Sequence, residues 1–315
     1  MKSKSRLERL LEQGHFVVTA ELGPPKGTRK SLVEKRAGYL RDAADAINIT
    51  DNQTAITRMS SLATSILVKQ MGLDPVMQIT CRDRNRLAIQ ADVLGAAAFG
   101  IYNILALSGD HQSFGNHPTA KNVYDLDSLH LVNMLTKMRD EKAFQSGDTF
   151  RGSVPIFVGA AANPYGDPFA FRPIRLAKKI NAGADFIQTQ AIYNVEKFAE
   201  YMKMAGDLGL HERMYMLAGV IPMKSHGMAR YMANSVAGMD VPAEMVKRMK
   251  GAKDAQEEGV QICLEIIEQL REIPGVDGIH IMAVAWEEIV PDVVERAGLM
   301  PRPEPSEDGE EDDES

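Results

Sequence analysis

A single acidic side chain follows an apolar segment near the start of the chain. In HFVVTAELGPPKG, five mostly apolar residues run into Glu21, and Gly-Pro-Pro then turns the chain away. Burial raises the pKa of a carboxyl group, so a glutamate at the end of a buried strand is suited to general acid catalysis. A lone glutamate in such a position more often caps a loop amide, and the catalytic interpretation therefore depends on the other strand ends.

Other short apolar segments also end in polar residues. These residues are Thr50, Asp51 and Asn52; Gln78, Thr80, Arg82 and Asp83; Ser108, Asp110 and His111; and Gln188 and Gln190. Asp110 alone is ambiguous, because Ser-Gly-Asp is a common turn sequence. Gln190 lies among apolar neighbours, where a buried glutamine either satisfies backbone groups or offers a donor and an acceptor to the edge of a heterocycle.

The elements that carry these residues predict a fold that gathers them. Apolar, β-branched runs occur eight times, at 16–22, 46–50, 76–81, 102–108, 154–160, 185–191, 214–220 and 278–284. Helical periodicity follows these runs, and the longest such segment spans 225–273. Eight β-then-α units favour a single α/β (β/α)8 TIM barrel over a doubly wound open sheet. We therefore expect one catalytic domain over residues 1–300, with the polar strand ends at one mouth, and this convergence favours a catalytic Glu21.

The composition excludes several classes of protein. The two cysteines, Cys81 and Cys263, are far apart, which indicates a reducing compartment and no disulfide framework. The N-terminal residues lack the apolar core of a signal peptide, and no stretch is apolar enough to span a membrane, so we expect a cytoplasmic protein with no membrane partner. His111 and His117 lack a third partner at metal-ligand spacing, so no metal site is predicted. Neither a Rossmann fingerprint nor a P-loop motif is present.

The charge is concentrated at the C-terminal end. Residues 301–315 hold eight acidic residues and one arginine, so residues 1–300 carry 35 acidic and 35 basic residues. A neutral body argues against nucleic-acid binding, and the acidic segment at 301–315 is expected to be a disordered tail.

Several motifs on these strands resemble those of the methylenetetrahydrofolate reductase family, which are flavin-dependent (β/α)8 enzymes. The motifs are AELGPP, QITCRD, LALSGD, NAGADFIQTQAIYN and AGVIPMKS, in the family's order along most of residues 10–300. The resemblance implies reduction of 5,10-methylenetetrahydrofolate to 5-methyltetrahydrofolate, with reduced flavin as hydride donor. FAD is the implied cofactor and FMN is the alternative.

The resemblance also implies roles for individual residues. Glu21 matches the general acid that protonates the folate as its imidazolidine ring opens, and Asp110 matches a catalytic aspartate near the flavin and the pterin. Substrate contacts are implied for Gln190, Tyr193 and His226. The positions that match cofactor contacts are Thr50, Gln78, Thr80, Ser108, Gly109, Asp110, Asn163 and Lys179.

Some positions depart from the family pattern. Ser108 replaces an arginine, Gln78 replaces a histidine, and Arg172 and Arg175 replace acidic and amide flavin ligands, while His226 replaces an aromatic residue that stacks on NAD(P)H. These departures resemble relatives from acetogenic and other anaerobic bacteria, which work beside a second subunit. We therefore expect an oligomer or hetero-oligomer that takes electrons from NAD(P)H or from a zinc- or iron–sulfur-containing partner subunit.

Two alternatives to the reductase remain open at this point. One is a pterin-binding barrel without redox chemistry, similar to methyltetrahydrofolate methyltransferases, and the other is a folate-binding subunit that has lost its flavin. Bound flavin distinguishes the reductase from both.

Overall fold

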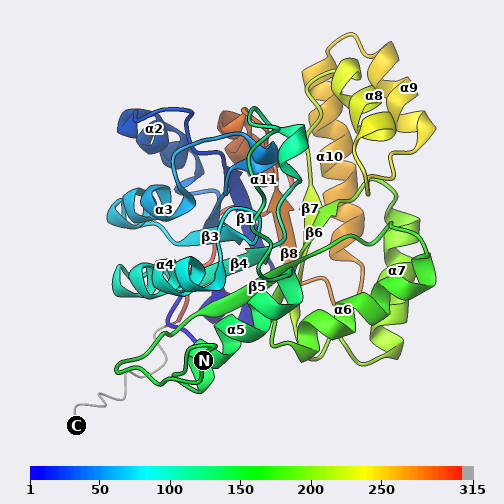
Figure 1. Cartoon of the computed structure of the whole chain (residues 1–315). Coiled ribbons are helices and arrows are strands. Elements are labelled where there is room, and N and C mark those ends of the chain that lie inside the picture. Colours follow the sequence, from blue (N-terminus) through cyan, green and yellow to red (C-terminus); the bar gives the residue numbers. More distant parts are fainter. Residues whose placement is uncertain (307–315) are drawn as a thin grey trace.

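The computed structural model describes residues 1–306 of the chain, and in it eight parallel strands close into a barrel in sequence order (Figure 1). The strands are β1 (Val17–Leu22), β2 (Ala46–Ile49), β3 (Pro75–Thr80), β4 (Asn103–Leu107), β5 (Phe157–Ala162), β6 (Phe186–Ala191), β7 (Tyr215–Val220) and β8 (Gly278–Ile281). β8 pairs back to β1, with Thr19 opposite His280, and this pairing closes the barrel. The (β/α)8 barrel predicted from the sequence is confirmed, although the fifth strand begins three residues later than the segment at 154–160 predicts.

Helices surround the strands. They are α2 (Lys30–Leu40), α3 (Ser61–Gln70), α4 (Arg86–Ala98), α5 (Ser128–Asp140), α6 (Arg172–Asn181), α7 (Val195–Asp207), α8 (His226–Ser235), α9 (Ala243–Gly251), α10 (Ala255–Arg271) and α11 (Val290–Arg296). Short 3-10 turns are η1 (Gln53–Ala55), η2 (Gln112–Phe114), η3 (Phe169–Phe171) and η4 (Glu287–Ile289). The helical region predicted at 225–273 is three helices, of which α8 and α9 lie beside α10 at the edge of the barrel (Figure 1). No helix within residues 1–306 combines the length and the apolar character needed to cross a membrane.

One end of the barrel interior is filled by apolar side chains. Alternate residues of a strand point inward, and the inward positions nearest this end carry Val17, Ala46, Val76, Leu105, Phe157, Phe186 and Leu217. The N-terminal helix α1 (Arg6–Glu12) adds Leu7, Leu10 and Leu11 to the same cluster and covers this end. The sequence did not predict α1, since seven residues are too few for a clear helical periodicity. The apolar plug leaves only the opposite end, where the strands finish, open for a site.

The C-terminal residues 301–306 lie against the closed end of the barrel. The Arg302 guanidinium is 2.5 Å from the buried carboxylate of Asp45 and donates to the Phe16 carbonyl over 2.8 Å. Residues 301–315 were expected to form a disordered tail, but residues 301–306 pack against the barrel, so the expectation is wrong for these six residues. Residues 307–315, the remainder of that tail, lie outside the described residues.

Candidate active site

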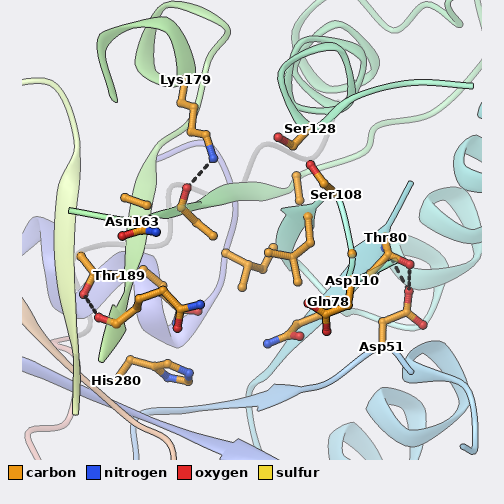
Figure 2. Close-up of a pocket in the computed structure, with 18 of the residues that line it drawn as sticks. Asp51, Gln78, Thr80, Ser108, Asp110, Ser128, Asn163, Lys179, Thr189 and His280 are labelled. Carbon is orange, nitrogen blue, oxygen red and sulfur yellow. Dashed lines mark hydrogen bonds between the residues drawn. The ribbon is translucent and has the colours of Figure 1, made fainter. Parts of the chain in front are cut away.

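A cavity of about 490 Å3 opens at the carboxyl ends of the strands (Figure 2). Strands β1, β3, β4, β5, β6 and β8 contribute to its lining, together with helix α6. Nine of the twelve residues singled out from the sequence line it: Glu21, Gln78, Thr80, Ser108, Gly109, Asp110, Asn163, Lys179 and Gln190. Barrel closure has thus brought side chains from six strands to one place, as expected for the active-site end of this fold.

Glu21 is a half-buried carboxyl group on the cavity wall. Within residues 1–306 its side chain has no hydrogen-bond partner, so it remains available to a bound molecule. Burial and, to a smaller extent, the nearby Glu287 carboxylate raise its pKa from 4.5 to about 7, and the Arg58 guanidinium partly opposes the change. A carboxyl group with this pKa holds a proton near neutral pH and can also release it.

A layer of buried polar residues borders the cavity above the apolar plug. Asn48 and Gln188 pair their amides through hydrogen bonds of 2.6 and 3.1 Å, and Gln188 also donates to the Thr19 hydroxyl. Thr19 Oγ1 lies 2.9 Å from His280 Nδ1. The Thr19 hydroxyl also donates to the Ile279 carbonyl over 3.4 Å, so it links the imidazole to the backbone of β8. Burial lowers the pKa of His280 to about 4, so this imidazole on the cavity lining is neutral.

A carboxylate on the cavity lining orients the end of β3. Asp51 accepts from both the amide and the hydroxyl of Thr80, over 2.9 and 3.0 Å (Figure 2). It also pairs with Arg84 through two further hydrogen bonds. Thr80 is therefore held in one orientation on the lining. Gln78, two residues earlier on the same strand, faces the same cavity.

The loop after β4 places Asp110 at the mouth. One Asp110 carboxylate oxygen accepts from the Thr54 amide over 3.0 Å, and the Asp110 carbonyl accepts from Arg82. Gly109 has φ +84°, and a Cβ there would lie 3.0 Å from the Cβ of Thr80. The site therefore needs glycine at this position both for its backbone conformation and for the close approach of Thr80.

Three basic side chains of α6 form one wall. Arg172, Arg175 and Lys179 all line the cavity, and Lys179 lies across it from His280 (Figure 2). The Lys179 ammonium donates to the Ala161 carbonyl, and burial together with Arg175 lowers its pKa to about 8. Arg172 Nε is buried and lacks a hydrogen-bond partner within residues 1–306. The wall is therefore positively charged and contains an unsatisfied donor, which is suited to an anionic group.

Three residues singled out from the sequence lie away from the cavity. Tyr193 is 1 % exposed, and its hydroxyl donates to the Ile221 carbonyl and contacts Met232, so packing already accounts for it. His226 is the first residue of α8 and does not line the cavity. Thr50 is buried behind the lining and reaches it only through its 2.7 Å hydrogen bond to Gln53.

The two glutamines of β6 differ from the expectation. The sequence analysis treated Gln190 as a buried glutamine, but its side chain is exposed on the cavity, and Gln188 is the buried residue, at 3 % exposure. Both point inward because they are two residues apart, and their depth along the barrel axis decides which one is covered.

Some site residues were missed by sequence reasoning. Asn48 and His280 interrupt apolar runs at inward positions of their strands, and this alternation was a usable signal. Glu287 and Arg58 lie in loops and carry no sequence signal. Arg172 and Arg175 were counted only as lost flavin ligands, whereas the structure places both on the wall of the cavity.

Over residues 1–306, no three His, Cys, Asp or Glu side chains are arranged so that they could hold a metal ion.

The fold and the site define a (β/α)8 protein with a half-buried acid and a basic wall at its open end, and sequence comparison assigns its family. The chain belongs to the methylenetetrahydrofolate reductase family, whose sequence profile matches residues 6–298. A probable methylenetetrahydrofolate reductase (NADPH) of Caenorhabditis elegans is 22 % identical over 93 % of this chain and 44 % of its own length. Methylenetetrahydrofolate reductase 2 of Schizosaccharomyces pombe is 25 % identical over 92 % of this chain and 46 % of its own length. The chain thus spans less than half the length of these curated relatives.

Solved structures share the fold at low sequence identity. An uncharacterized protein from Clostridium thermocellum, which binds two copies of 5-methyl-5,6,7,8-tetrahydrofolic acid, superimposes with a TM-score of 0.67 at 16 % identity. The superposition covers 93 % of this chain and all of that protein. A 2,3-dimethylmalate lyase of the PEP mutase/isocitrate lyase superfamily has a TM-score of 0.51 at 13 % identity, covering 95 % of this chain and 89 % of its own. At these identities the likeness establishes the barrel fold.

Proposed function

We propose that this chain reduces 5,10-methylenetetrahydrofolate to 5-methyltetrahydrofolate in the cavity at the open end of the barrel. Glu21 is the general acid in this proposal. The observation that carries it is an inward-facing carboxyl group with no hydrogen-bond partner in the described part of the chain and a pKa of about 7. Membership of the methylenetetrahydrofolate reductase family, together with relatives named as such reductases, supports the choice of substrate.

The proposed role of Glu21 is to protonate the folate when its five-membered ring opens. The methylene carbon of the substrate bridges two nitrogens in a five-membered ring and becomes electrophilic when one of its C–N bonds breaks. In our proposal the Glu21 carboxyl group protonates the departing nitrogen as that bond breaks, so that the nitrogen leaves as a neutral amine. The resulting iminium carbon accepts a hydride and becomes the methyl group. Near neutral pH about half of the Glu21 side chains carry the required proton.

The pterin needs neutral hydrogen-bonding groups on the lining. Gln78 and Gln190 each offer a donor and an acceptor, and His280 adds a neutral imidazole supported from below by Thr19. Asp110 is held in place by the Thr54 amide and offers its second carboxylate oxygen. We assign Gln190 and Asp110 to the folate, and Gln78 to the boundary between folate and cofactor.

The remaining part of the cavity offers groups suited to a flavin. Leu105, Leu107 and Leu176 provide an apolar surface for its ring system, and the α6 wall provides charge for phosphate. Arg172 Nε, buried without a partner among residues 1–306, supports an anionic ligand at this wall. These bases also compensate for the arginine that Ser108 replaces. When bound, reduced flavin would supply the hydride, and we propose FAD, with FMN as the alternative.

The cofactor contacts follow from the lining and from the family resemblance. We assign Thr80, Ser108, Gly109, Asn163 and Lys179 to the flavin, and Thr50 acts through Gln53. Tyr193 and His226 remain predictions, and neither lines the cavity. The electron source is proposed to be NAD(P)H or an electron-delivering partner subunit.

A half-reaction tests the role of Glu21 without requiring the physiological electron donor. The purified protein is loaded with flavin, reduced with dithionite under anaerobic conditions, and mixed with methylenetetrahydrofolate while flavin absorbance is followed. We expect reoxidation in the wild type and a rate at least ~100-fold lower in Glu21→Gln, because an amide cannot donate the proton. The matched control is Glu34→Gln on the exposed face of α2, which should reoxidise at the wild-type rate.

The outcomes separate the proposed function from its alternatives. If the flavin of Glu21→Gln is reoxidised as fast as that of the wild type, Glu21 is not the general acid. If this variant no longer binds flavin, the role of Glu21 is structural. A wild-type protein that binds folate but no flavin points to the methyltransferase-like or folate-binding alternatives. The mass of the released cofactor decides between FAD and FMN, and bleaching by NADH or NADPH decides whether a partner subunit is needed.

A further inference from the structure

A second buried carboxyl group lies close to Glu21 and has no part in the reaction proposed above. Glu287 opens the 3-10 turn η4, after β8, and is 4 % exposed. Because β8 pairs with β1, with Ala20 opposite Ile281, the loop after β8 leaves the barrel beside the loop after Glu21. A buried carboxyl group with no reaction to perform needs a structural explanation.

One arginine links the two loops. Arg36 of α2 donates from Nη1 to the Gly23 carbonyl over 2.9 Å, and the same nitrogen lies 3.5 Å from Glu287 Oε1. Gly23 is only two residues beyond Glu21. Burial raises the pKa of Glu287, and the ion pair with Arg36 opposes this effect by favouring the charged form, whereas Glu21 has no ion pair and no hydrogen bond among residues 1–306.

The other charged groups around this pair are few. Arg58, in the loop after β2, donates to the Pro24 carbonyl over 3.0 Å, and its charge favours ionisation of Glu21. Lys224 and Glu288 act on Glu287 in opposite directions, and Lys224 is bonded to the Ala285 carbonyl. His280, on the strand next to Glu21, is neutral. Glu287 is thus the like-charged neighbour of Glu21 in this cluster.

We propose that Glu287 is a positioning residue for catalysis, whose negative charge, held by Arg36, keeps the proton on Glu21. The two carboxyl groups differ in their surroundings, so one is ionised and the other is protonated. Glu287 sits against a cation and is the anion, and Glu21 faces the cavity without a partner and holds the proton. The inference rests on the proposed role of Glu21 as general acid.

The structure gives this arrangement a physical cause. Two nearby carboxylates repel each other, so the first to ionise makes the second harder to ionise, and the titration belongs to the pair. Arg36 decides which group ionises first. The raised pKa of Glu21, to which Glu287 contributes after burial, agrees with this order.

The test is a direct titration of Glu21 in the complete chain. Glutamate labelled with 13C at the carboxyl carbon is incorporated, and the Glu21 signal is identified by its loss in Glu21→Gln. In Glu287→Gln the titration midpoint of Glu21 should fall by about 0.5 pH unit or more, which is a modest effect for a neighbouring like charge. Glu34→Gln is the control, because it removes one carboxylate from the exposed face of α2, and its Glu21 midpoint should match the wild type.

Kinetics provide a second measurement on the same variants. With Glu21 protonated less often above neutral pH, the folate half-reaction of Glu287→Gln should slow more at pH 8 than at pH 6, while KM for the folate stays unchanged. Glu287→Asp keeps the charge but withdraws it by one methylene, so its midpoint should lie between those of the wild type and the glutamine variant. This variant also serves if Glu287→Gln does not fold.

Each outcome has one meaning. An unchanged or higher Glu21 midpoint in Glu287→Gln overturns the inference, even if the variant is less stable, because a structural role alone would not move the titration. A higher midpoint in Glu287→Asp overturns it too. If Glu21→Gln retains the full folate half-reaction, the proposed function fails instead, and the midpoint still measures the coupling of the two carboxyl groups.

Discussion

The free energy of unfolding of Glu21→Gln, taken relative to that of the wild type, should be higher at pH 8 than at pH 4. In the folded protein the pKa of Glu21 is raised, so folding favours its protonated form. A group of this kind contributes stability below its unfolded pKa and loses that contribution as the pH rises through its folded pKa. Glutamine mimics the protonated carboxyl group at every pH, so the variant escapes this loss.

The magnitude follows from the size of the change in pKa. The pKa of Glu21 is raised from 4.5 to about 7, and each pKa unit corresponds to about 1.4 kcal/mol in the free energy of unfolding. The full change would be about 3 kcal/mol, and partial exposure to water in the cavity reduces it, so we expect about 1 to 3 kcal/mol. The change should accumulate between pH 4.5 and pH 7 and then level off.

Urea denaturation at intervals between pH 4 and pH 8 measures this difference. Trp286 is the single tryptophan, is 8 % exposed and precedes Glu287, so its fluorescence reports on the region of interest. The difference in unfolding free energy between Glu21→Gln and the wild type isolates Glu21, since the other titrating groups are common to both. Glu34→Gln, on the surface of α2, controls for loss of one carboxylate and should stay within about 0.5 kcal/mol of the wild type.

One result would refute the reasoning. If the difference between Glu21→Gln and the wild type is flat from pH 4 to pH 8, or if the wild type gains relative stability as the pH rises, Glu21 is ionised in the folded protein. It could not then store a proton for the folate near neutral pH, and its role as general acid would fall with it.

Four further predictions concern packing and buried polar groups. Arg302→Ala should lower the free energy of unfolding by about 3 kcal/mol, measured by urea denaturation at pH 7. The reason is that the buried Asp45 carboxylate loses its nearer cation and keeps, among residues 1–306, only the more distant Arg6. Asn48→Ala should cost about 1 to 3 kcal/mol in the same assay, since the Gln188 amide loses both of its bonds to Asn48. Gly259→Ala should destabilise by about 1 to 3 kcal/mol, because its Cβ would lie 1.7 Å from the Met223 carbonyl oxygen. Gly38→Ala on helix α2 should instead stabilise the protein by about 0.5 to 1 kcal/mol, because its Cβ would meet nothing within 4 Å. The melting temperatures of the two glycine variants measure this contrast, and a change in the same direction in both would contradict the packing argument.

Much of the fold could be predicted from local patterns. Strands covered on both faces need near-continuous apolar runs, and helices need a period of 3.6 residues, so the number and order of the barrel strands were readable from the chain. The polar residues at the strand ends were equally readable, and Glu21 and Asp110 do line one cavity. Helix α1 escaped prediction because its two turns acquire meaning only when they cover the end of a closed barrel.

The depth of each inward side chain was beyond sequence reasoning. Gln188 and Gln190 share one face of β6, and only the register of the closed barrel puts the first into the buried layer and the second on the cavity. Similarly, Tyr193 follows the same strand but turns into the core, where Met232 and the Ile221 carbonyl surround its hydroxyl.

The sequence by itself determined the eight β/α units, their order and the polar residues at the strand ends, because these depend on residues near one another along the chain. The tertiary structure alone decided the proton affinity of Glu21. That property depends on burial and on Glu287 and Arg58, which come from separate segments of the chain and meet Glu21 only because β8 closes against β1. Electrostatic effects follow distance in space, and a chain pattern carries no record of that distance until the barrel has closed.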